Sequence, residues 1–287
     1  MDPNAEESYA KNSLTYKAFN VTRTLGNWVN HMVHIVPGVL SSNPDILDFT
    51  QTQTKIWKGH SEGLYVVIHG LNGNPYTLGV PIANSIRKNK DMDSYDVVVP
   101  LVPNKGNCAL HMAARPIYNL IIDYIDHNPT KPIHLICASN GCRIGSFIEC
   151  KLRYVDINIR VTALVGAYGG SRLVEKYPRV LSSILHTDVL SDLKLNSDVN
   201  NNLKQQMMKP VVKGTRSYEF YRTANDWLIP NINDCFPDVN ATEVVYHDLA
   251  EGIDHVGLGY YKIEEILDNS LKWMRDNDTT EYKFIYN

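Results

Sequence analysis

Short apolar runs rich in β-branched residues recur along the chain from residue 64 onward, and stretches with helical spacing separate them. The runs lie at 64–68, 95–99, 133–137, 161–165, 217–221 and 242–246. The first four are apolar at nearly every position, which is typical of strands buried on both faces of a parallel sheet. Helical spacing of apolar residues covers 116–126, 143–153 and 262–275. Strands that alternate with helices predict an α/β fold with a mostly parallel central sheet flanked by helices.

Two segments do not follow this alternation. After the fourth strand the chain shows no strand pattern for about 40 residues, and a structureless loop of that length is uncommon in a compact domain. We therefore expect a helical cap insertion at about 171–213, within a domain that spans 60–287. Before this domain, apolar residues at helical spacing predict an amphipathic helix over 15–36. We expect residues 1–59 to be an N-terminal extension packed on the core, with peripheral contact to lipid as the alternative.

Composition narrows the class of protein. The chain has 287 residues, of which 44% are apolar, so it can close a substantial hydrophobic core. A net charge of −3 supplies no basic field for a phosphate backbone, which argues against nucleic acid as a partner. Five irregularly spaced cysteines indicate reduced thiols rather than a disulfide framework. Since no secretory leader pattern and no long apolar run is seen, we expect a cytoplasmic protein without a transmembrane span.

The clearest chemical motif is Cys137-Ala-Ser139-Asn-Gly141, which joins the apolar run at 133–137 to a predicted helix. Small residues around a serine fit a sharp strand–turn–helix joint, in which a strained backbone projects the hydroxyl away from the sheet. The motif matches G-x-S-x-G except that Cys137 replaces the first glycine. Cys142 replaces a further glycine that often follows. These two thiols lead us to expect a helix that packs less closely on its strand.

Four ordered motifs, each just after a predicted strand, resemble those of the α/β-hydrolase superfamily, in particular its lipases and serine esterases. They are Val67-Ile-His-Gly-Leu-Asn-Gly-Asn74, the serine turn, Arg222-Thr-Ala-Asn-Asp-Trp-Leu-Ile-Pro230 and Gly252-Ile-Asp-His-Val-Gly-Leu258. The resemblance covers about residues 60–276 outside the cap. It implies an α/β-hydrolase fold, and the order serine, acid, histidine along the chain is the one this fold uses.

Carried over position by position, the resemblance implies a catalytic triad of Ser139, Asp226 and His255. It also implies an oxyanion hole made by the backbone N–H groups of Leu71 and Asn140. The chemistry fits these roles, because an imidazole with an ordinary pKa of about 6.5 can take the proton of a serine hydroxyl and return it to the leaving group. The carboxylate would hold that imidazole in the productive tautomer.

Other acids and histidines are alternatives for these roles. Asp234, Asp238 and Asp254 compete with Asp226, but they lack a preceding strand or lie too close to His255 in sequence to face its ring. His69 is better explained as a structural residue of the oxyanion loop than as a proton carrier.

Taken together, the motifs predict hydrolysis of an uncharged carboxylic ester, from a small molecule or a lipid, through an acyl-serine intermediate. We expect an acyl pocket lined by the residues beside the motifs, namely Tyr76, Trp227, Leu228 and Val256. A thioesterase or amidase with the same triad is an alternative, and so is an inactive hydrolase fold that serves as a binding module or scaffold. No nucleotide or metal motif occurs, so we expect neither a cofactor nor a metal. The patterns predict no particular oligomeric state.

Overall fold

A computed structural model describes residues 46–48, 57–73, 75–76, 78–183, 185–224, 226, 228–229, 231–249, 255 and 257–278. All of these residues belong to one compact unit that spans Asn43–Asn287. The amphipathic helix predicted over 15–36 lies outside the described residues, as does most of the predicted extension at 1–59.

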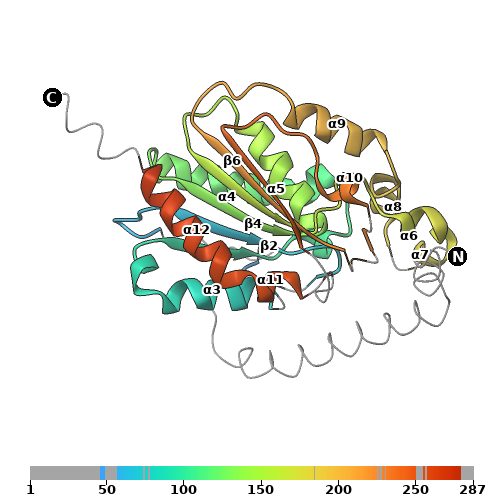
Figure 1. Cartoon of the computed structure of the whole chain (residues 1–287), viewed down its shortest axis with the longest axis horizontal. Helices are drawn as coiled ribbons and strands as arrows, with labels where there is room; N and C mark the ends of the chain where they lie inside the picture. The colour runs from blue at the N-terminus through green and yellow to red at the C-terminus, as the bar shows by residue number, and fades with distance from the viewer. Residues whose placement is uncertain are drawn as a thin grey trace, which may run out of the picture. The chain divides into compact units, whose positions relative to one another are not determined.

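A seven-stranded parallel sheet runs through the described unit (Figure 1), in the order β1-β3-β2-β4-β5-β6-β7. The strands are β1 (Ile46–Leu47), β2 (Leu64–Ile68), β3 (Asp96–Pro100), β4 (Ile133–Ala138), β5 (Ile159–Leu164), β6 (Arg216–Thr223) and β7 (Glu243–Leu249). Cys137 on β4 pairs with Ile68 on β2 and with Ala163 on β5, so the carboxyl ends of these three strands are level. Residues that follow the strands therefore share one edge of the sheet.

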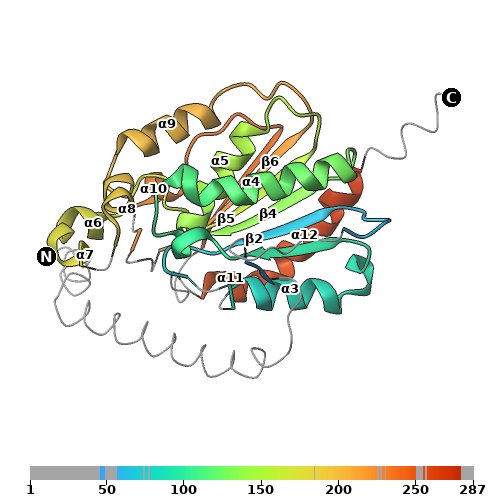
Figure 2. The same ribbon diagram turned by 180° about the vertical axis from the view of Figure 1, so that it is seen from behind.

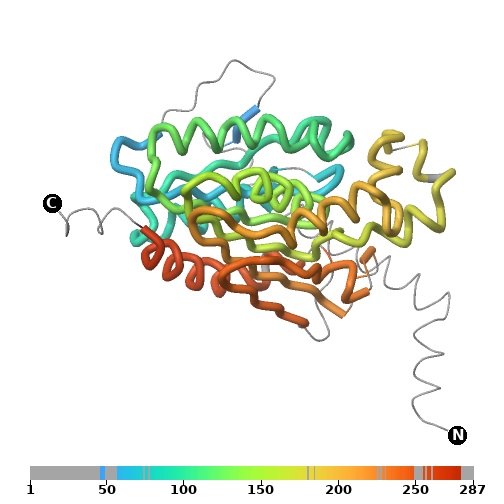
Figure 3. Tube along the Cα trace, turned by 90° about the horizontal axis from the view of Figure 1, so that it is seen from above, coloured from blue at the N-terminus to red at the C-terminus, as the bar shows by residue number. Residues whose placement is uncertain are grey.

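Helices cover both faces of the sheet (Figures 2 and 3). On one face lie α4 (Leu110–His127) and α5 (Asn140–Lys151), and on the other lie α3 (Gly79–Lys88), α11 (Leu258–Tyr261) and α12 (Ile263–Asp276). Strand β2 feeds both cores: Leu64, Val66 and Ile68 join the α4–α5 side, whereas Tyr65 and Val67 join the α3–α12 side. Burial on both faces explains why the strands are apolar without alternation, and it confirms the predicted α/β fold class.

Several element boundaries differ from the sequence prediction. Helix α4 begins at Leu110 rather than 116, with Pro116 inside it, and α5 begins at Asn140 rather than 143. Helix α3 has no counterpart among the predicted elements, and Gly79 and Pro81 lie near its start. A proline is tolerated in the first turn, where its missing N–H would have no intrahelical acceptor.

Four helices occupy the segment predicted as a cap. They are α6 (Arg172–Lys176), α7 (Pro178–Leu181), α8 (Thr187–Asp192) and α9 (Asp198–Met207). Leu203 and Met207 of α9 join the same core as Ile144 and Ile148 of α5, so the end of the insertion is fixed on the main body. Short helical turns η1 (Lys90–Met92), η2 (Pro103–Gly106) and α10 (Ile232–Cys235) complete the secondary structure. No helix in the described part of the chain has the length and apolar character needed to cross a bilayer.

Candidate active site

Ser139 occupies the turn between β4 and α5 in a strained backbone conformation. Its φ of 53° and ψ of −122° lie in a region that non-glycine residues rarely adopt, at a cost of about 1–3 kcal/mol. Its N–H donates to the carbonyl of Leu164 at the end of β5 (2.9 Å), and its own carbonyl accepts from the N–H of Cys142 (3.1 Å). These bonds hold the side chain at the carboxyl edge of the sheet, at the start of α5.

Beneath this turn, α5 packs closely on β4, contrary to the looser packing expected from Cys137. Cys137 is fully buried, and its Sγ fills the space where a side chain at position 145 would lie, so only glycine fits there. The Cys142 thiol donates to the carbonyls of Cys137 (3.3 Å) and Leu164 (3.4 Å). The expectation was wrong because Gly145, one helical turn further on, compensates for the thiol of Cys137.

The loop after β2 lies directly beside the serine. A Cβ built on Gly70 would be 2.9 Å from Cβ of Ser139 and 3.4 Å from its Oγ. The next residues are held by hydrogen bonds from Asn72 N–H to the carbonyl of Lys105 (2.8 Å) and from Gly73 N–H to that of Gly70 (3.1 Å). The absence of a side chain at Gly70 therefore lets this loop approach the hydroxyl.

His69 of this loop has both ring nitrogens engaged. Nδ1 lies 2.9 Å from the carbonyl of Gly70, and Nε2 accepts from the N–H of Val102 at 3.4 Å. Burial lowers the pKa of His69 below its ordinary value, which favours a neutral ring. This arrangement fits the structural role expected from the sequence.

Two backbone N–H groups, those of Leu71 and Asn140, have no backbone acceptor among the described residues. Asn140 is the first residue of α5, so its N–H has no intrahelical partner. No hydrogen bond from the N–H of Leu71 is found within the described residues. These are the two groups predicted to bind an oxyanion.

Asp226 and His255 lie in contact, one after β6 and the other after β7. Oδ2 of Asp226 is 2.7 Å from Nδ1 of His255, with side chains 0% and 8% exposed. Oδ1 accepts hydrogen bonds from the N–H groups of Leu228 (2.9 Å) and Ile229 (3.0 Å), which fix the carboxylate. A carboxylate oxygen accepts, so Nδ1 carries the proton and Nε2 is left with its lone pair.

Neither of the two competing acids that the structure describes hydrogen-bonds to this imidazole. Asp234 accepts a hydrogen bond from the Asn231 side chain (2.9 Å), and Asp238 is exposed. Asp254 lies outside the described residues.

Ser139 follows β4 and His255 follows β7, so both come after the carboxyl ends of strands of the parallel sheet. Gly259 of α11 lies four residues after His255 and packs against Leu164, since a Cβ on that glycine would be 3.5 Å from Leu164 Cδ1. The carbonyl of Leu164 in turn accepts the N–H of Ser139. Within the described part of the chain, no hydrogen bond joins the imidazole to the serine hydroxyl. Catalytic hydrogen bonds of unliganded enzymes are often long and shorten when substrate binds.

Arg143, which the sequence does not single out, is a buried cation in the first turn of α5. Its Nη1 donates to Oδ1 of Asn140 at 2.8 Å, and its Nη2 donates to the carbonyl of Asp192 in the cap at 3.3 Å. The signal available in the sequence was a charged residue among the small and apolar residues that open α5.

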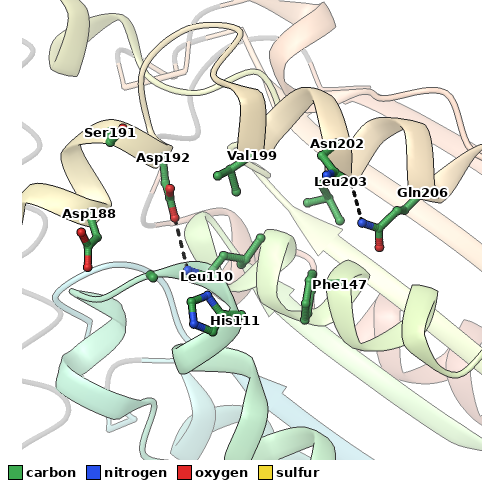
Figure 4. Close-up of a pocket in the computed structure, with 11 residues that line it drawn as sticks. Leu110, His111, Phe147, Asp188, Ser191, Asp192, Val199, Asn202, Leu203 and Gln206 are labelled. Carbon is green, nitrogen blue, oxygen red and sulfur yellow. Dashed lines mark hydrogen bonds between the residues drawn. The ribbon is translucent and has the colours of Figure 1, made fainter.

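Only part of the predicted acyl pocket can be placed. Leu228 and Leu71 are partly buried and pack on an apolar cluster that the cap helices share with Ile229 and Cys235. Tyr76 is partly exposed, and Trp227 and Val256 lie outside the described residues. One described cavity, of about 450 Å³ between α4, α5, α8 and α9 (Figure 4), contains none of the four predicted residues. The acyl pocket therefore stays a prediction.

The five cysteines are free and buried. Among the described residues, no group of three or more His, Cys, Asp or Glu side chains could hold a metal ion.

The matches between this chain and known proteins are matches of structure alone. No protein-family model and no curated protein sequence matches it. A structure from work on LipS and LipT, two metagenome-derived lipolytic enzymes, matches with a TM-score of 0.54 and 14% identity, covering 77% of this chain and 100% of that one.

Two further structures are less similar. MGS-MChE2, an α/β-hydrolase enzyme from the metagenome of Mar Chica lagoon sediments in Morocco, has a TM-score of 0.48 and 16% identity over 76% of this chain and 93% of its own. Phospholipase PlaB from Legionella pneumophila has a TM-score of 0.42 and 15% identity over 55% of this chain, which spans only 39% of that protein. The parallel sheet, the strained serine turn between β4 and α5 and the structural likeness together show that this chain has the α/β-hydrolase fold.

Proposed function

We propose that this protein is a serine hydrolase that cleaves an uncharged carboxylic ester through an acyl-Ser139 intermediate. The observation that carries the proposal is the 2.7 Å hydrogen bond between Asp226 and His255, at the sheet edge that also holds Ser139. A buried carboxylate fixed by two backbone N–H groups is suited to orient an imidazole and to stabilise its protonated form.

In acylation, Oγ of Ser139 attacks the carbonyl carbon of the ester, and its proton passes to Nε2 of His255. The negative charge that forms on the carbonyl oxygen accepts hydrogen bonds from the N–H groups of Leu71 and Asn140. Each such donor contributes about 10²–10³ in rate. When the tetrahedral intermediate collapses, the alkoxide takes the proton from His255 and leaves as an alcohol.

Deacylation repeats these steps with water. Nε2 of His255 takes a proton from a water molecule, whose oxygen attacks the acyl carbon. The second tetrahedral intermediate releases the carboxylic acid, and the proton returns from His255 to Oγ of Ser139.

The surroundings of the proposed oxyanion hole favour an apolar acyl group. Leu71 follows the loop glycine beside the hydroxyl, and Leu228 follows the acid. Both pack on the cluster formed with Val174, Val189 and other cap residues. An acyl chain bound between the cap and these leucines would bury apolar surface at about 25 cal/mol per Å². Small-molecule and lipid esters both fit this chemistry.

The test is covalent labelling with a fluorescent fluorophosphonate, which reacts with an activated serine. We expect the folded wild type to be labelled and Ser139→Ala to remain unlabelled. A panel of p-nitrophenyl esters graded by acyl length, run beside matched thioester and amide substrates, then determines the substrate class. A folded wild type that neither takes the label nor turns over any of these substrates would overturn the proposal and favour a binding module or scaffold.

A further inference from the structure

Arg143 is a buried cation in the first turn of α5, and among the described residues no carboxylate lies within salt-bridge distance of its guanidinium, although the charge of Asp192 acts on it. Its side chain is fully buried, with 2% of the residue exposed. Burial lowers its pKa to about 10, so it remains charged near neutral pH. Arg153, just beyond the end of α5, is equally buried but pairs with Glu149 at 3.0 Å. Burying a charge without such a pair is costly, and the charge of Asp192 offsets only part of the effect of burial on Arg143, so this guanidinium points to a role besides stability.

The hydrogen bonds of Arg143 connect the serine turn between β4 and α5 with the cap helices. On one side Nη1 reaches the Asn140 side chain, and on the other Nη2 reaches the carbonyl of Asp192, the last residue of α8. The carbonyl of Asp192 also accepts from the Ser197 hydroxyl at 2.7 Å, and a cation beside the carboxyl end of a helix is favourable. The Asp192 side chain accepts from the N–H of Leu110 at 3.2 Å, so α8 is also tied to the start of α4 (Figure 4).

The Asn140 side chain continues this network toward the second oxyanion donor. Its Nδ2 donates to the carbonyl of Gly106 at 3.4 Å, at the end of η2. The carbonyl of Lys105 in the same turn accepts the N–H of Asn72, the residue after Leu71. Hydrogen bonds thus link the cap through Arg143 to the side chain of Asn140, and through the η2 turn to Asn72, the residue next to Leu71.

We propose that Arg143 is a positioning residue, which ties the oxyanion donor Asn140 to the end of cap helix α8 so that the cap sets the geometry of the oxyanion hole. This inference rests on the proposed function. Arginine suits the task because its planar fork donates in two fixed directions, whereas a lysine ammonium is a single point charge. A donor displaced by about 1 Å costs about 10² in rate, so a modest shift of Asn140 has a large effect.

The experiment compares Arg143→Met with Arg153→Met, which removes an equally buried cation just beyond the end of α5 without touching the serine turn. Rates are expressed per Ser139 that reacts with fluorophosphonate, so that unfolded protein does not count. We expect Arg143→Met to lower kcat by about 10- to 100-fold with little change in KM, and Arg153→Met to leave kcat near the wild-type value. An equal kcat in the two variants would overturn the inference.

A mutant cycle tests whether Arg143 acts through the Asn140 side chain. Asn140→Ala removes the acceptor but keeps the backbone N–H, so it should lower kcat to a similar extent, and the double variant should lose little more. Fully additive losses would mean that the two residues act independently, which contradicts the proposal. If Arg143→Met does not fold, the same loss of kcat is still expected of Asn140→Ala alone.

Hydrogen exchange separates failure of this inference from failure of the proposed function. We expect faster amide exchange in α8 and in the first turn of α5 for Arg143→Met, and unchanged exchange in α8 for Arg153→Met. If amide exchange in α8 is unchanged in Arg143→Met, the link between the cap and the serine turn is refuted, whatever the esterase activity of the variant. A wild type without esterase activity would instead remove the proposed function, and the exchange result would still decide the link.

Discussion

The carboxylate of Asp226 and the imidazole of His255 form a 2.7 Å hydrogen bond across 29 residues of sequence. Both side chains sit just past the ends of the neighbouring parallel strands β6 and β7. The backbone N–H groups of Leu228 and Ile229 hold the second carboxylate oxygen, so the acid presents only Oδ2 to the ring. With Nδ1 engaged by Asp226, Nε2 is the ring nitrogen available as an acceptor.

We expect Asp226→Asn to lower kcat for ester hydrolysis by about 10⁴ with little loss of stability. The asparagine oxygen can still accept from the two backbone N–H groups, but its NH₂ group donates to Nδ1 and forces the proton onto Nε2. Steady-state kinetics with a p-nitrophenyl ester measures the loss. Asp234→Asn is the control, since its carboxylate bonds to Asn231 and not to His255. Equal losses in the two variants would refute the role of Asp226.

Gly70→Ala should reduce both fluorophosphonate labelling and kcat by about 10², because the added methyl group would displace the serine or the loop beside it. The Cβ would lie 2.9 Å from Cβ of Ser139, closer than two carbons can pack. Gly59→Ala is the control, since nothing lies within 4 Å of a Cβ at that exposed position. Full activity of Gly70→Ala would show that this loop does not form the reactive corner.

The effect of Gly145→Ala on stability should reverse sign with the residue at position 137. In the wild type the new methyl group would overlap Sγ of Cys137 and lower the free energy of unfolding by about 1–3 kcal/mol. In a Cys137→Ala background the clash is absent, and alanine should raise the stability by up to about 1 kcal/mol through its higher helix propensity. Urea denaturation of the four variants measures both values. A destabilisation of the same size in both backgrounds would exclude Sγ as the cause.

Stability should fall as the pH is lowered below about 6.5, partly because of His134. This residue is fully buried between the hydroxyls of Ser270 and Thr162 (2.8 Å to the latter), and burial holds its pKa well below the ordinary value. The unfolded chain then binds a proton that the native protein does not, so each such histidine contributes a slope of up to about 1.4 kcal/mol per pH unit.

Urea denaturation between about pH 7.5 and 5 tests this expectation. His134→Asn should flatten the slope, and His69, whose pKa is also lowered, should maintain part of it. His127→Gln is the control, because that imidazole is 61% exposed. A slope in His134→Asn identical to that of the wild type would contradict the assignment.

The sequence was sufficient to predict the α/β fold and the sharp strand–turn–helix joint at Ser139. Strands β2 to β5 are buried on both faces, so their apolar character is continuous and readable without a structure. The turn at Ser139 follows from local chemistry, since small neighbours are needed wherever a serine adopts a left-handed φ. Local requirements of this kind depend only on neighbouring residues.

Elements that depend on distant partners were not predictable in the same way. Strand β1 has two residues and exists only because it pairs with β3, and α3 has Gly79 and Pro81 near its start. The close packing of α5 depends on the fit between Cys137 and Gly145, which no spacing rule reveals.

Tertiary structure also decided which polar groups meet. The sequence favours Asp226 over Asp234 and Asp238 because it follows a predicted strand, but only the folded chain shows that it contacts His255. Likewise, Arg143 is an isolated charge in the sequence, and its bonds to Asn140 and Asp192 exist because the cap folds back onto α5. Hydrogen bonds act over about 3 Å, whereas the sequence records only separation along the chain, so pairing between remote segments is settled by packing.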